Sequence, residues 1–331
     1  MRLKTPSFWY QKKGVCAWLL MLPSLIYGLG RKIDVKRSEK KRASIPIICI
    51  GNLTAGGTGK TPICIALLKL LADSAPCFIS RGYGRKDKEV KLVDLSSDTH
   101  LSVGDEPLLL ADHAPTIVGA DRYESSKLAS ALGYKLIIMD DGLQNTKLDK
   151  DISFCVIDGA SGFGNEMLMP AGPLRERIED GLKRIDAFII TGEDQLNIKE
   201  RLPKDKPIFI ASLDVSPNFK YDKQSTYIGF CGIGRPGKFE DSLINAGLKL
   251  DAFYSYADHH VFTQAELDEL LRKAEKINAR LITTAKDVKR IPLNFIKDND
   301  IDILPVELNW EDESALKSFL EEKLKKAKAV R

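Results

Sequence analysis

Apolar runs of strand length alternate with helical patterns along the first two thirds of the chain. This alternation is typical of a mostly parallel sheet that is covered by helices on both faces. It predicts an α/β domain over residues 43–216. The runs on which this prediction rests lie at residues 45–50, 77–80, 116–118, 135–140, 152–157, 188–191 and 208–211.

A second alternation follows a polar stretch at residues 214–224, which contains Pro217 and is a candidate linker. It consists of shorter strand patterns, a helical pattern over residues 263–278 and a charged helical pattern at the C-terminus. We expect a second, smaller α/β domain over residues 217–331 that completes a cleft with the first. Its strand patterns lie at residues 227–230, 252–256, 281–284 and 301–304.

The first 42 residues have a different pattern. Residues 14–30 carry no charge, and basic residues flank them on both sides. The run is at the short edge of what a membrane-spanning helix needs, and Pro23 interrupts it. A core helix and a signal peptide are further alternatives, but no small-x-small cleavage site follows the run. We favour an interfacial helix that places residues 1–32 against a membrane surface.

Composition is that of an ordinary globular protein, with 44% hydrophobic and 29% charged residues in 331. The net charge of +4 is unevenly spread, because residues 1–42 hold 11 Lys and Arg against 2 acidic residues. The basic excess is therefore local, which favours an anionic membrane surface and argues against nucleic acid as a partner. The six cysteines form no C-x-x-C pair, so neither a zinc site nor a disulfide framework is predicted.

The strongest chemical signal is a glycine-rich turn between a strand pattern and a helix pattern, at residues 51–62. Backbone N–H groups at such a junction converge on phosphate, and the positive end of the helix faces it. Lys60 is expected to reach the outer phosphates of a nucleotide and Thr61 to bind Mg²⁺. A strand, a glycine-rich turn and a helix in this order make the domain over residues 43–216 P-loop NTPase-like. The sequence departs from the general P-loop pattern because Thr54 stands where the first glycine is expected. The predicted phosphate-binding residues are Thr54, Ala55, Gly56, Gly57, Thr58, Gly59, Lys60 and Thr61.

Two acids, Asp140 and Asp141, end the apolar strand pattern at residues 135–140. P-loop proteins place a strand-end carboxylate near the Mg²⁺ in this way. Phosphoryl transfer also needs a group that takes the proton of the acceptor hydroxyl. Asp105 and His259 are candidates, although a helix cap explains Asp105 and a surface histidine is often inert. Arginines in loops at positions 81, 85, 122 and 175 are candidates for binding phosphate.

Ten short motifs in one order give the chain a family resemblance. The chain resembles the tetraacyldisaccharide 4'-kinases of the lipid A pathway, over positions 46 to 290 and in its N-terminal arm. The motifs are the glycine-rich turn at 51–62 and the segments 80–85, 103–107, 119–122, 139–144, 163–165, 168–176, 258–260 and 284–287, together with the basic apolar arm.

This resemblance implies Mg²⁺-dependent transfer of the ATP γ-phosphate to the 4'-hydroxyl of a tetraacyldisaccharide 1-phosphate. It implies that this happens on the cytoplasmic face of a Gram-negative inner membrane. It assigns Asp105 and His259 as the pair that activates the acceptor, with Asp140 and Asp141 near the metal. The family shares the threonine at position 54. The positions expected to face the substrate are Arg81, Arg122, Asn165 and Arg175.

Two departures from the family pattern fall in loops expected on the substrate side. Asn145 stands where the family usually has histidine, and Glu166 stands where it usually has glycine. The main alternative function is a membrane-attached P-loop ATPase switch of the partitioning type. Such switches carry a signature lysine at the position of Ala55, which weakens this alternative.

Overall fold

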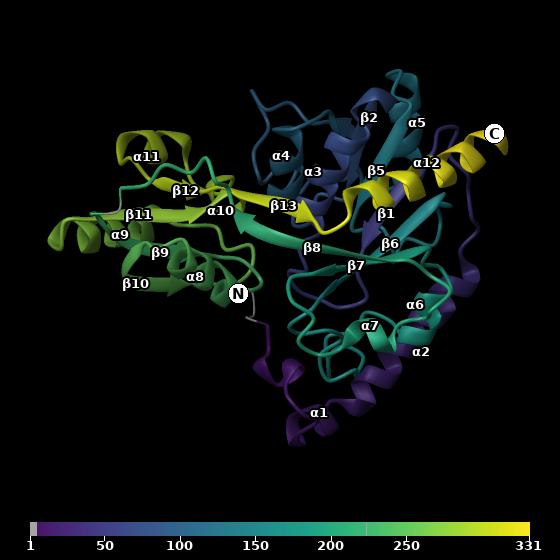
Figure 1. Cartoon of the computed structure of the whole chain (residues 1–331), viewed down its shortest axis with the longest axis horizontal. Helices are drawn as coiled ribbons and strands as arrows, with labels where there is room; N and C mark the ends of the chain where they lie inside the picture. The colour runs from purple at the N-terminus through teal and green to yellow at the C-terminus, as the bar shows by residue number, and fades with distance from the viewer. Residues whose placement is uncertain (1–4, 223) are drawn as a thin grey trace.

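The computed structural model describes residues 5–222 and 224–331, and it contains two α/β units (Figure 1). Residues 1–4 of the predicted arm and residue 223 of the predicted linker lie outside the described residues. The larger unit holds the glycine-rich turn, and the smaller unit holds His259. Their arrangement decides which predicted site residues meet.

The larger unit is built on a nine-stranded sheet in the order β13-β8-β7-β6-β1-β5-β2-β4-β3. Its seven central strands are parallel, and only the edge strands β13 and β3 pair antiparallel. All of these central strands except β8 are buried along their whole length, which explains their nearly continuous apolar sequences. This confirms the predicted fold class. The strands are β1 (Ile47–Gly51), β2 (Pro76–Ser80), β3 (Lys91–Leu92), β4 (Thr116–Val118), β5 (Leu136–Asp140), β6 (Ile152–Asp158), β7 (Ala187–Thr191), β8 (Ile208–Val215) and β13 (Val306–Trp310).

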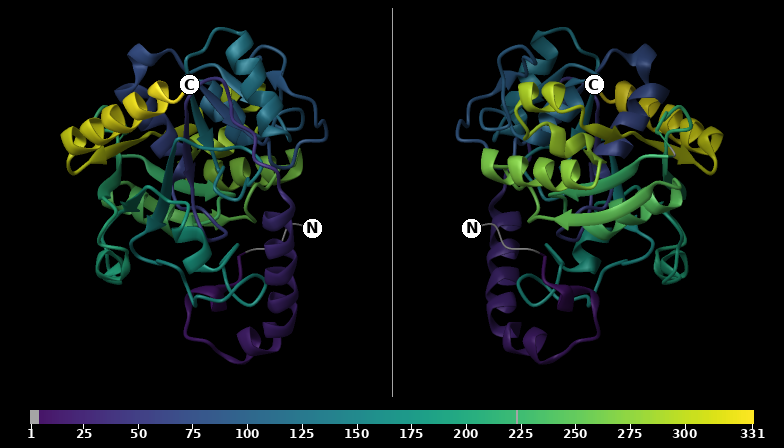
Figure 2. Two further views of the ribbon diagram at one scale, coloured as in Figure 1. Left: turned by 90° about the vertical axis from the view of Figure 1, so that its right-hand side faces the viewer. Right: turned by 90° about the vertical axis from the view of Figure 1, so that its left-hand side faces the viewer.

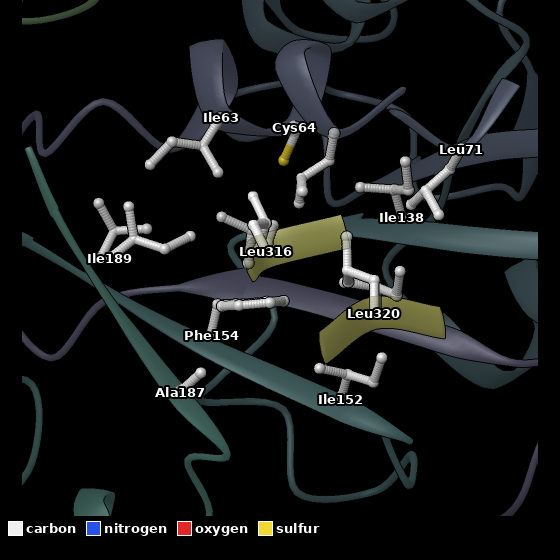
Figure 3. Close-up of a cluster of buried hydrophobic side chains, with 14 of the residues drawn as sticks. Ile63, Cys64, Leu71, Ile138, Ile152, Phe154, Ala187, Ile189, Leu316 and Leu320 are labelled. Atoms are coloured by element: carbon white, nitrogen blue, oxygen red, sulfur yellow. The ribbon is translucent and has the colours of Figure 1, made fainter. Parts of the chain in front are cut away.

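Helices α3 and α12 share the apolar layer on one face of this sheet (Figure 3). Ile63 and Cys64 of α3 and Leu316 and Leu320 of α12 contact a core that includes Phe154 of β6. The remaining helices of this unit join the strands. The helices outside the arm are α3 (Lys60–Leu70), α4 (Asp105–Ala111), α5 (Arg122–Ala131), α6 (Ile178–Leu182), α7 (Ile198–Arg201) and α12 (Glu313–Ala329), with a short 3-10 turn η2 (Ala72–Ser74).

The smaller unit has a parallel four-stranded sheet in the order β10-β9-β11-β12. Aromatic side chains such as Phe230 and Phe262 pack edge to face in one of its two cores. Its elements are β9 (Thr226–Cys231), α8 (Pro236–Asn245), β10 (Lys249–Ser255), α9 (Gln264–Lys276), β11 (Ala279–Thr284), α10 (Ala285–Val288), α11 (Leu293–Asp298) and β12 (Asp302–Leu304).

The C-terminal segment corrects the expected domain boundary. Residues 306–331 do not belong to the smaller unit, because β13 pairs with β8 of the large sheet from Val306↔Val215 to Trp310↔Ala211. Helix α12 then returns Leu316, Leu320 and Leu324 to the core of the larger unit. Two antiparallel strands therefore connect the units, and β8 extends into the stretch predicted as a linker (Figure 1).

The N-terminal arm forms a 3-10 turn η1 (Ser7–Tyr10) and two helices, α1 (Val15–Leu19) and α2 (Met21–Arg37), which lie on the outside of the larger unit (Figure 2). Pro23 falls in the first turn of α2, where a missing N–H donor costs little. None of the described helices has the length and apolar character needed to cross a bilayer. The core-helix alternative is wrong, since apolar side chains cover the outer surface of α1 and α2. Those exposed by more than 40% are Val15, Trp18, Leu19, Met21, Leu22, Leu25, Ile26, Leu29 and Ile33.

The position of α12 yields a stability prediction. Leu320 is 1% exposed in the core of the larger unit, so Leu320→Ala should leave a cavity and lower the free energy of unfolding by about 2–5 kcal/mol. Lys317→Ala, on the exposed side of the same helix, is the matched control and should change it by less than about 0.5 kcal/mol. Urea denaturation followed by circular dichroism measures both. Equal effects would mean that α12 does not pack on this sheet.

Candidate active site

The glycine-rich turn joins β1 to α3 with the geometry of a phosphate cradle. Gly56 has φ of 111° and Gly59 has φ of 82°, values that a residue with a Cβ rarely adopts. Lys60 and Thr61 are the first two residues of α3. The unpaired N–H groups of this first turn therefore face the loop, where an anion is favoured.

The sequence departure at Thr54 has a structural reason. Thr54 forms an antiparallel bridge with Leu174, and the N–H of Ala55 donates to the carbonyl of Pro173 at 2.7 Å. A residue in such a bridge has an extended backbone, which does not require glycine. Inside the loop, Asn52 Nδ2 donates to Thr58 Oγ1 at 3.0 Å. The cradle is thus held by neighbouring loops as well as by its own turns.

Asp140 lies beside the start of α3 because β5 is the parallel neighbour of β1, with Ile50 opposite Asp140. Thr61 Oγ1 donates to Asp140 Oδ2 at 3.3 Å. Burial and the charge of Glu106 raise the pKa of Asp140 to about 7. A buried carboxylate and a hydroxyl are hard oxygen donors, and Mg²⁺ is usually held by one or two such groups plus substrate phosphates. Thr61 and Asp140 fit that ion.

Asp141 is held differently from its neighbour. It has a left-handed backbone with φ of 49°, and Arg175 Nη1 donates to its two carboxylate oxygens at 2.8 and 2.9 Å. Lys60 Nζ lies 3.7 Å from Asp141 Oδ1. Burial alone raises its pKa, but Lys60 and Arg175 outweigh this and lower the pKa of Asp141 to about 2. Asp141 therefore positions two cations, while Asp140 faces the hydroxyl of Thr61.

Asp105 and His259 meet across the boundary between the two units. Asp105 begins α4 after Gly104, whose φ of 96° requires glycine, and it is 4% exposed. His259 Nδ1 lies 2.8 Å from Asp105 Oδ2 and 3.0 Å from Oδ1. His259 itself has a left-handed backbone, with φ of 56°. A carboxylate that orients an imidazole is the arrangement of a general base with its positioning partner.

Cations from the smaller unit surround this pair. Arg290 Nε lies 3.3 Å from Asp105 Oδ2, and Lys286 Nζ lies 3.0 Å from Glu106 Oε1. Burial raises the pKa of Asp105, but the hydrogen bond with His259 and the charges of Lys286 and Arg290 prevail and lower it. Asp105 is therefore a carboxylate at neutral pH. Lys286 and Arg290 were not predicted as site residues, although the segment 284–287 is one of the family motifs.

The predicted substrate arginines differ in burial. Arg122 is 4% exposed at the start of α5, and its Nη1 donates to the carbonyl of Gly119 at 2.6 Å. Burial and the charge of Arg81 lower the pKa of Arg122 to about 10. Arg81 is exposed after β2. The charges of Asp141 and Asp140, at the end of β5, also act on Arg122 and oppose this lowering of its pKa.

Asn165, Asn145 and Glu166 each make contacts that hold a loop or a turn. Asn165 is 6% exposed, and its Nδ2 donates to the carbonyl of Ala171 at 2.9 Å, so its amide holds the loop at 163–175. The side chain of Asn145 accepts N–H bonds from Lys147 and Leu148 in a turn. Glu166 forms an ion pair with Arg201 on α7.

A cavity of about 630 Å³ lies beside the cradle, between the two units. Gly234 approaches so closely that a Cβ there would lie 2.9 Å from the N atom of Gly57. Asp158 at the end of β6 is 1% exposed and pairs with Arg235 at 2.7 Å and with Lys238. Apart from an acid at a strand end, no pattern in the sequence predicts these contacts. The lining residues include Tyr10, Thr191, Glu193, Gln195, Arg235 and Lys238.

Comparison with known proteins gives concordant matches. Residues 16–325 match the family model of LpxK, described as tetraacyldisaccharide-1-P 4'-kinase. Proteins named tetraacyldisaccharide 4'-kinase from Paramagnetospirillum magneticum and Parvibaculum lavamentivorans are 41% and 44% identical. The alignments cover 95% and 87% of this chain and 97% and 87% of those proteins. The crystal structure of LpxK from Aquifex aeolicus in complex with ATP is 27% identical, with a TM-score of 0.74 over 93% of this chain and 99% of that chain.

The lowered pKa of Asp105 predicts a pH-dependent stability. A carboxyl whose pKa is lower in the folded protein adds stability above its unfolded pKa and loses it as the pH falls through the folded value. Asp105→Asn should therefore destabilise the protein at neutral pH, and the difference from the unsubstituted protein should shrink below about pH 4. Urea denaturation over this pH range measures it. Asp112→Asn, at the more exposed end of α4, is the control and should barely change the free energy of unfolding. If the effect of Asp105→Asn on this free energy does not vary with pH, the ionic contacts of Asp105 are contradicted.

Proposed function

The chain belongs to the tetraacyldisaccharide-1-P 4'-kinase family and is a 4'-kinase of that lipid A precursor; on this premise we propose that Asp105 and His259 activate the acceptor hydroxyl for attack on the γ-phosphate of ATP. The family match favours this kinase over a partitioning-type ATPase switch. The observation that carries the proposal is the contact of 2.8 Å between the two side chains across the unit boundary.

The cradle supplies the nucleotide site. The loop at residues 54–59 and the start of α3 would hold the outer phosphates, with Lys60 against the transferred group. The cavity beside Gly57, lined by Thr191, Glu193 and Gln195, would take the nucleoside. Thr61 and Asp140 would hold Mg²⁺, which when bound neutralises charge on the β- and γ-phosphates. Asp141 would keep Lys60 and Arg175 pointed at the phosphates.

His259 would be the proton acceptor and Asp105 its positioning partner. A carboxylate bound to Nδ1 fixes the tautomer in which Nδ1 carries the proton, so that Nε2 presents a lone pair to the acceptor. The acceptor hydroxyl gives its proton to Nε2 while its oxygen forms the bond to phosphorus, and the bond to the β-phosphate oxygen breaks. Asp105 then stabilises the imidazolium cation that results.

Arginines and the N-terminal arm would hold the lipid. Arg81 and Arg122, together with Arg175, provide positive charge for the phosphate of the acceptor. The contacts of Asn165 support a role in loop structure, which makes it a weaker substrate candidate. Tyr27 Oη of α2 donates to the carbonyl of Arg175 at 3.0 Å, and Arg31 Nη2 donates to the carbonyl of Gln144 at 2.7 Å. Helix α2 thus borders the loops that surround the site.

We place the apolar outer surface of α1 and α2 against the inner membrane, on the face where ATP is present. Basic residues flank this surface in the sequence, and Lys and Arg near anionic lipid contribute about 1 kcal/mol each. A helix that lies in the interface fits both the exposure of its apolar side chains and its charged flanks. The substrate's acyl chains would then stay in the bilayer while its sugar reaches the cleft.

The catalytic assignment predicts a defect in turnover. Asp105→Ala and His259→Ala should each lower kcat by about 10²–10⁴-fold, because each removes a part of the base. Binding of a fluorescent ATP analogue should stay within threefold of the unsubstituted enzyme, because neither residue belongs to the cradle. Formation of the bis-phosphorylated lipid, followed by mass spectrometry, measures kcat. Asp112→Ala is the matched control, and full activity of either variant would remove that residue from the mechanism.

The membrane assignment predicts loss of vesicle binding without loss of fold. The triple substitution Leu22→Glu, Leu25→Glu and Leu29→Glu places charge on exposed apolar positions of α2. Sedimentation with anionic vesicles should fall at least tenfold, while the thermal unfolding midpoint stays within a few degrees. Leu132→Glu, at an exposed leucine outside the arm, should bind as before. Retained sedimentation of the triple variant would place the membrane contact elsewhere.

A further inference from the structure

Lys286 lies in the segment Thr284-Ala-Lys286-Asp287, which the mechanism above does not use. Helix α10 begins here, and Thr284 Oγ1 accepts the N–H of Asp287 at 3.1 Å. Asp287 is fully buried, and its Oδ1 accepts the N–H of Gly232 at 2.8 Å and pairs with Arg290 at 2.6 Å. The backbone that carries Lys286 is therefore fixed on both sides.

The ammonium of Lys286 reaches out of the smaller unit into the boundary with the larger one. Its Nζ lies 3.0 Å from Glu106 Oε1 and 3.4 Å from Nε2 of His259. Asp258 Oδ1 is 4.0 Å away. Burial lowers the pKa of Lys286, but the charges of Glu106, Asp105 and Asp258 prevail and raise it, so the group is a cation at neutral pH.

The ammonium of Lys286 lies beside Nε2 of His259, the ring nitrogen that does not contact Asp105. Nδ1 of His259 is bound to Asp105, so the acceptor hydroxyl has to deliver its proton at Nε2. It must then approach within about 3 Å of Nε2, which is the region where Lys286 Nζ lies. Asp258 Oδ1, buried and 3.8 Å from Nε2, has no hydrogen-bond partner among the described residues. A hydroxyl group that enters beside Nε2 could therefore donate a hydrogen bond to Asp258 Oδ1.

Glu106, the partner of Lys286, is the neighbour of Asp105 in the first turn of α4. Glu106 therefore holds the ammonium of Lys286 beside the base, at the boundary of the two units. A cation beside the base is placed where negative charge moves during phosphoryl transfer. The larger unit supplies a second cation, Lys60, at the start of α3.

We propose that Lys286 is a catalytic residue of the kinase, whose ammonium contacts the acceptor oxygen and an oxygen of the transferred phosphoryl group. This rests on the proposed function of His259. The acceptor O–H proton passes to His259 Nε2, the acceptor oxygen bonds to the γ-phosphorus, and the bond to the β-phosphate oxygen breaks with its electron pair leaving on ADP. Lys286 keeps its protons and releases Glu106 when the phosphates enter.

A purely structural role for Lys286, as a link between the units, makes a different prediction. The chain offers a matched control in Lys289, three residues further on, which bridges the same units to Asp112 at 2.6 Å. Lys289 contacts neither His259 nor Glu106 in any described interaction. If Lys286 only links the units, removing either lysine should have a similar effect.

The first experiment compares Lys286→Met with Lys289→Met. Lys286→Met should lower kcat about 10²–10³-fold, as expected for loss of one preorganised donor. Its KM for the lipid and its affinity for a fluorescent ATP analogue should change less than threefold. Lys289→Met should keep kcat within threefold. A Lys286→Met variant with kcat within threefold of the unsubstituted enzyme, or a Lys289→Met variant equally impaired, overturns the proposal.

A second experiment separates loss of charge from misfolding. The other cysteines are buried except Cys16, so Lys286→Cys in a Cys16→Ala background can be alkylated with 2-bromoethylamine to restore an ammonium at nearly the same length. Alkylation should raise kcat at least tenfold over the unmodified variant, whereas iodoacetamide should not. No rescue by the amine, with the thiol shown to be modified by mass spectrometry, overturns the proposal. His259→Ala, assayed beside it, reports independently on the base: full activity there refutes the proposed function instead.

Discussion

Burial of the Asp105 carboxylate is the constraint on which the active site depends. A buried ion is costly unless cations and hydrogen bonds compensate it. Its cationic partners Lys286 and Arg290, and the imidazole of His259, all come from the smaller unit. The arrangement in which the two units touch is therefore the one in which this charge is satisfied. The same arrangement brings Gly234 of the smaller unit against Gly57 of the phosphate cradle.

The connection between the units suits this requirement. The smaller unit is inserted between β8 and β13, two antiparallel strands of the large sheet, so both of its ends are attached to one rigid element. Such an insertion limits the directions in which the smaller unit can move. Asp158 at the end of β6 pairs with Arg235 and Lys238 of that unit, which gives a second charged contact beside the cavity. Ion pairs thus join the two units both at α4 and at the end of β6.

Features that depend on residues close together in the chain can be predicted from the sequence. The alternation of strands and helices, the cradle at residues 51–62 and the strand-end acid Asp140 are such features, and the structure confirms the fold class. The return of residues 306–331 to the large sheet was missed because an edge strand of five residues carries no marker of its partner. The amphipathic spacing of Leu316, Leu320 and Leu324 predicts a buried face but does not say which unit buries it. Lys286 and Arg290 were missed for the same reason, since their partners are about 180 positions away in sequence.

The N-terminal arm contacts both the cradle and the smaller unit through one side chain. Tyr10 Oη donates to the carbonyl of Ala55 at 3.2 Å, and the guanidinium of Arg235 lies 5.0 Å over the ring of Tyr10. One aromatic side chain thus contacts both the phosphate loop and the smaller unit. Because Tyr10 lies in η1, at the start of the arm, any displacement of the arm acts on both of these contacts. The cradle, the smaller unit and the arm are therefore parts of one connected structure.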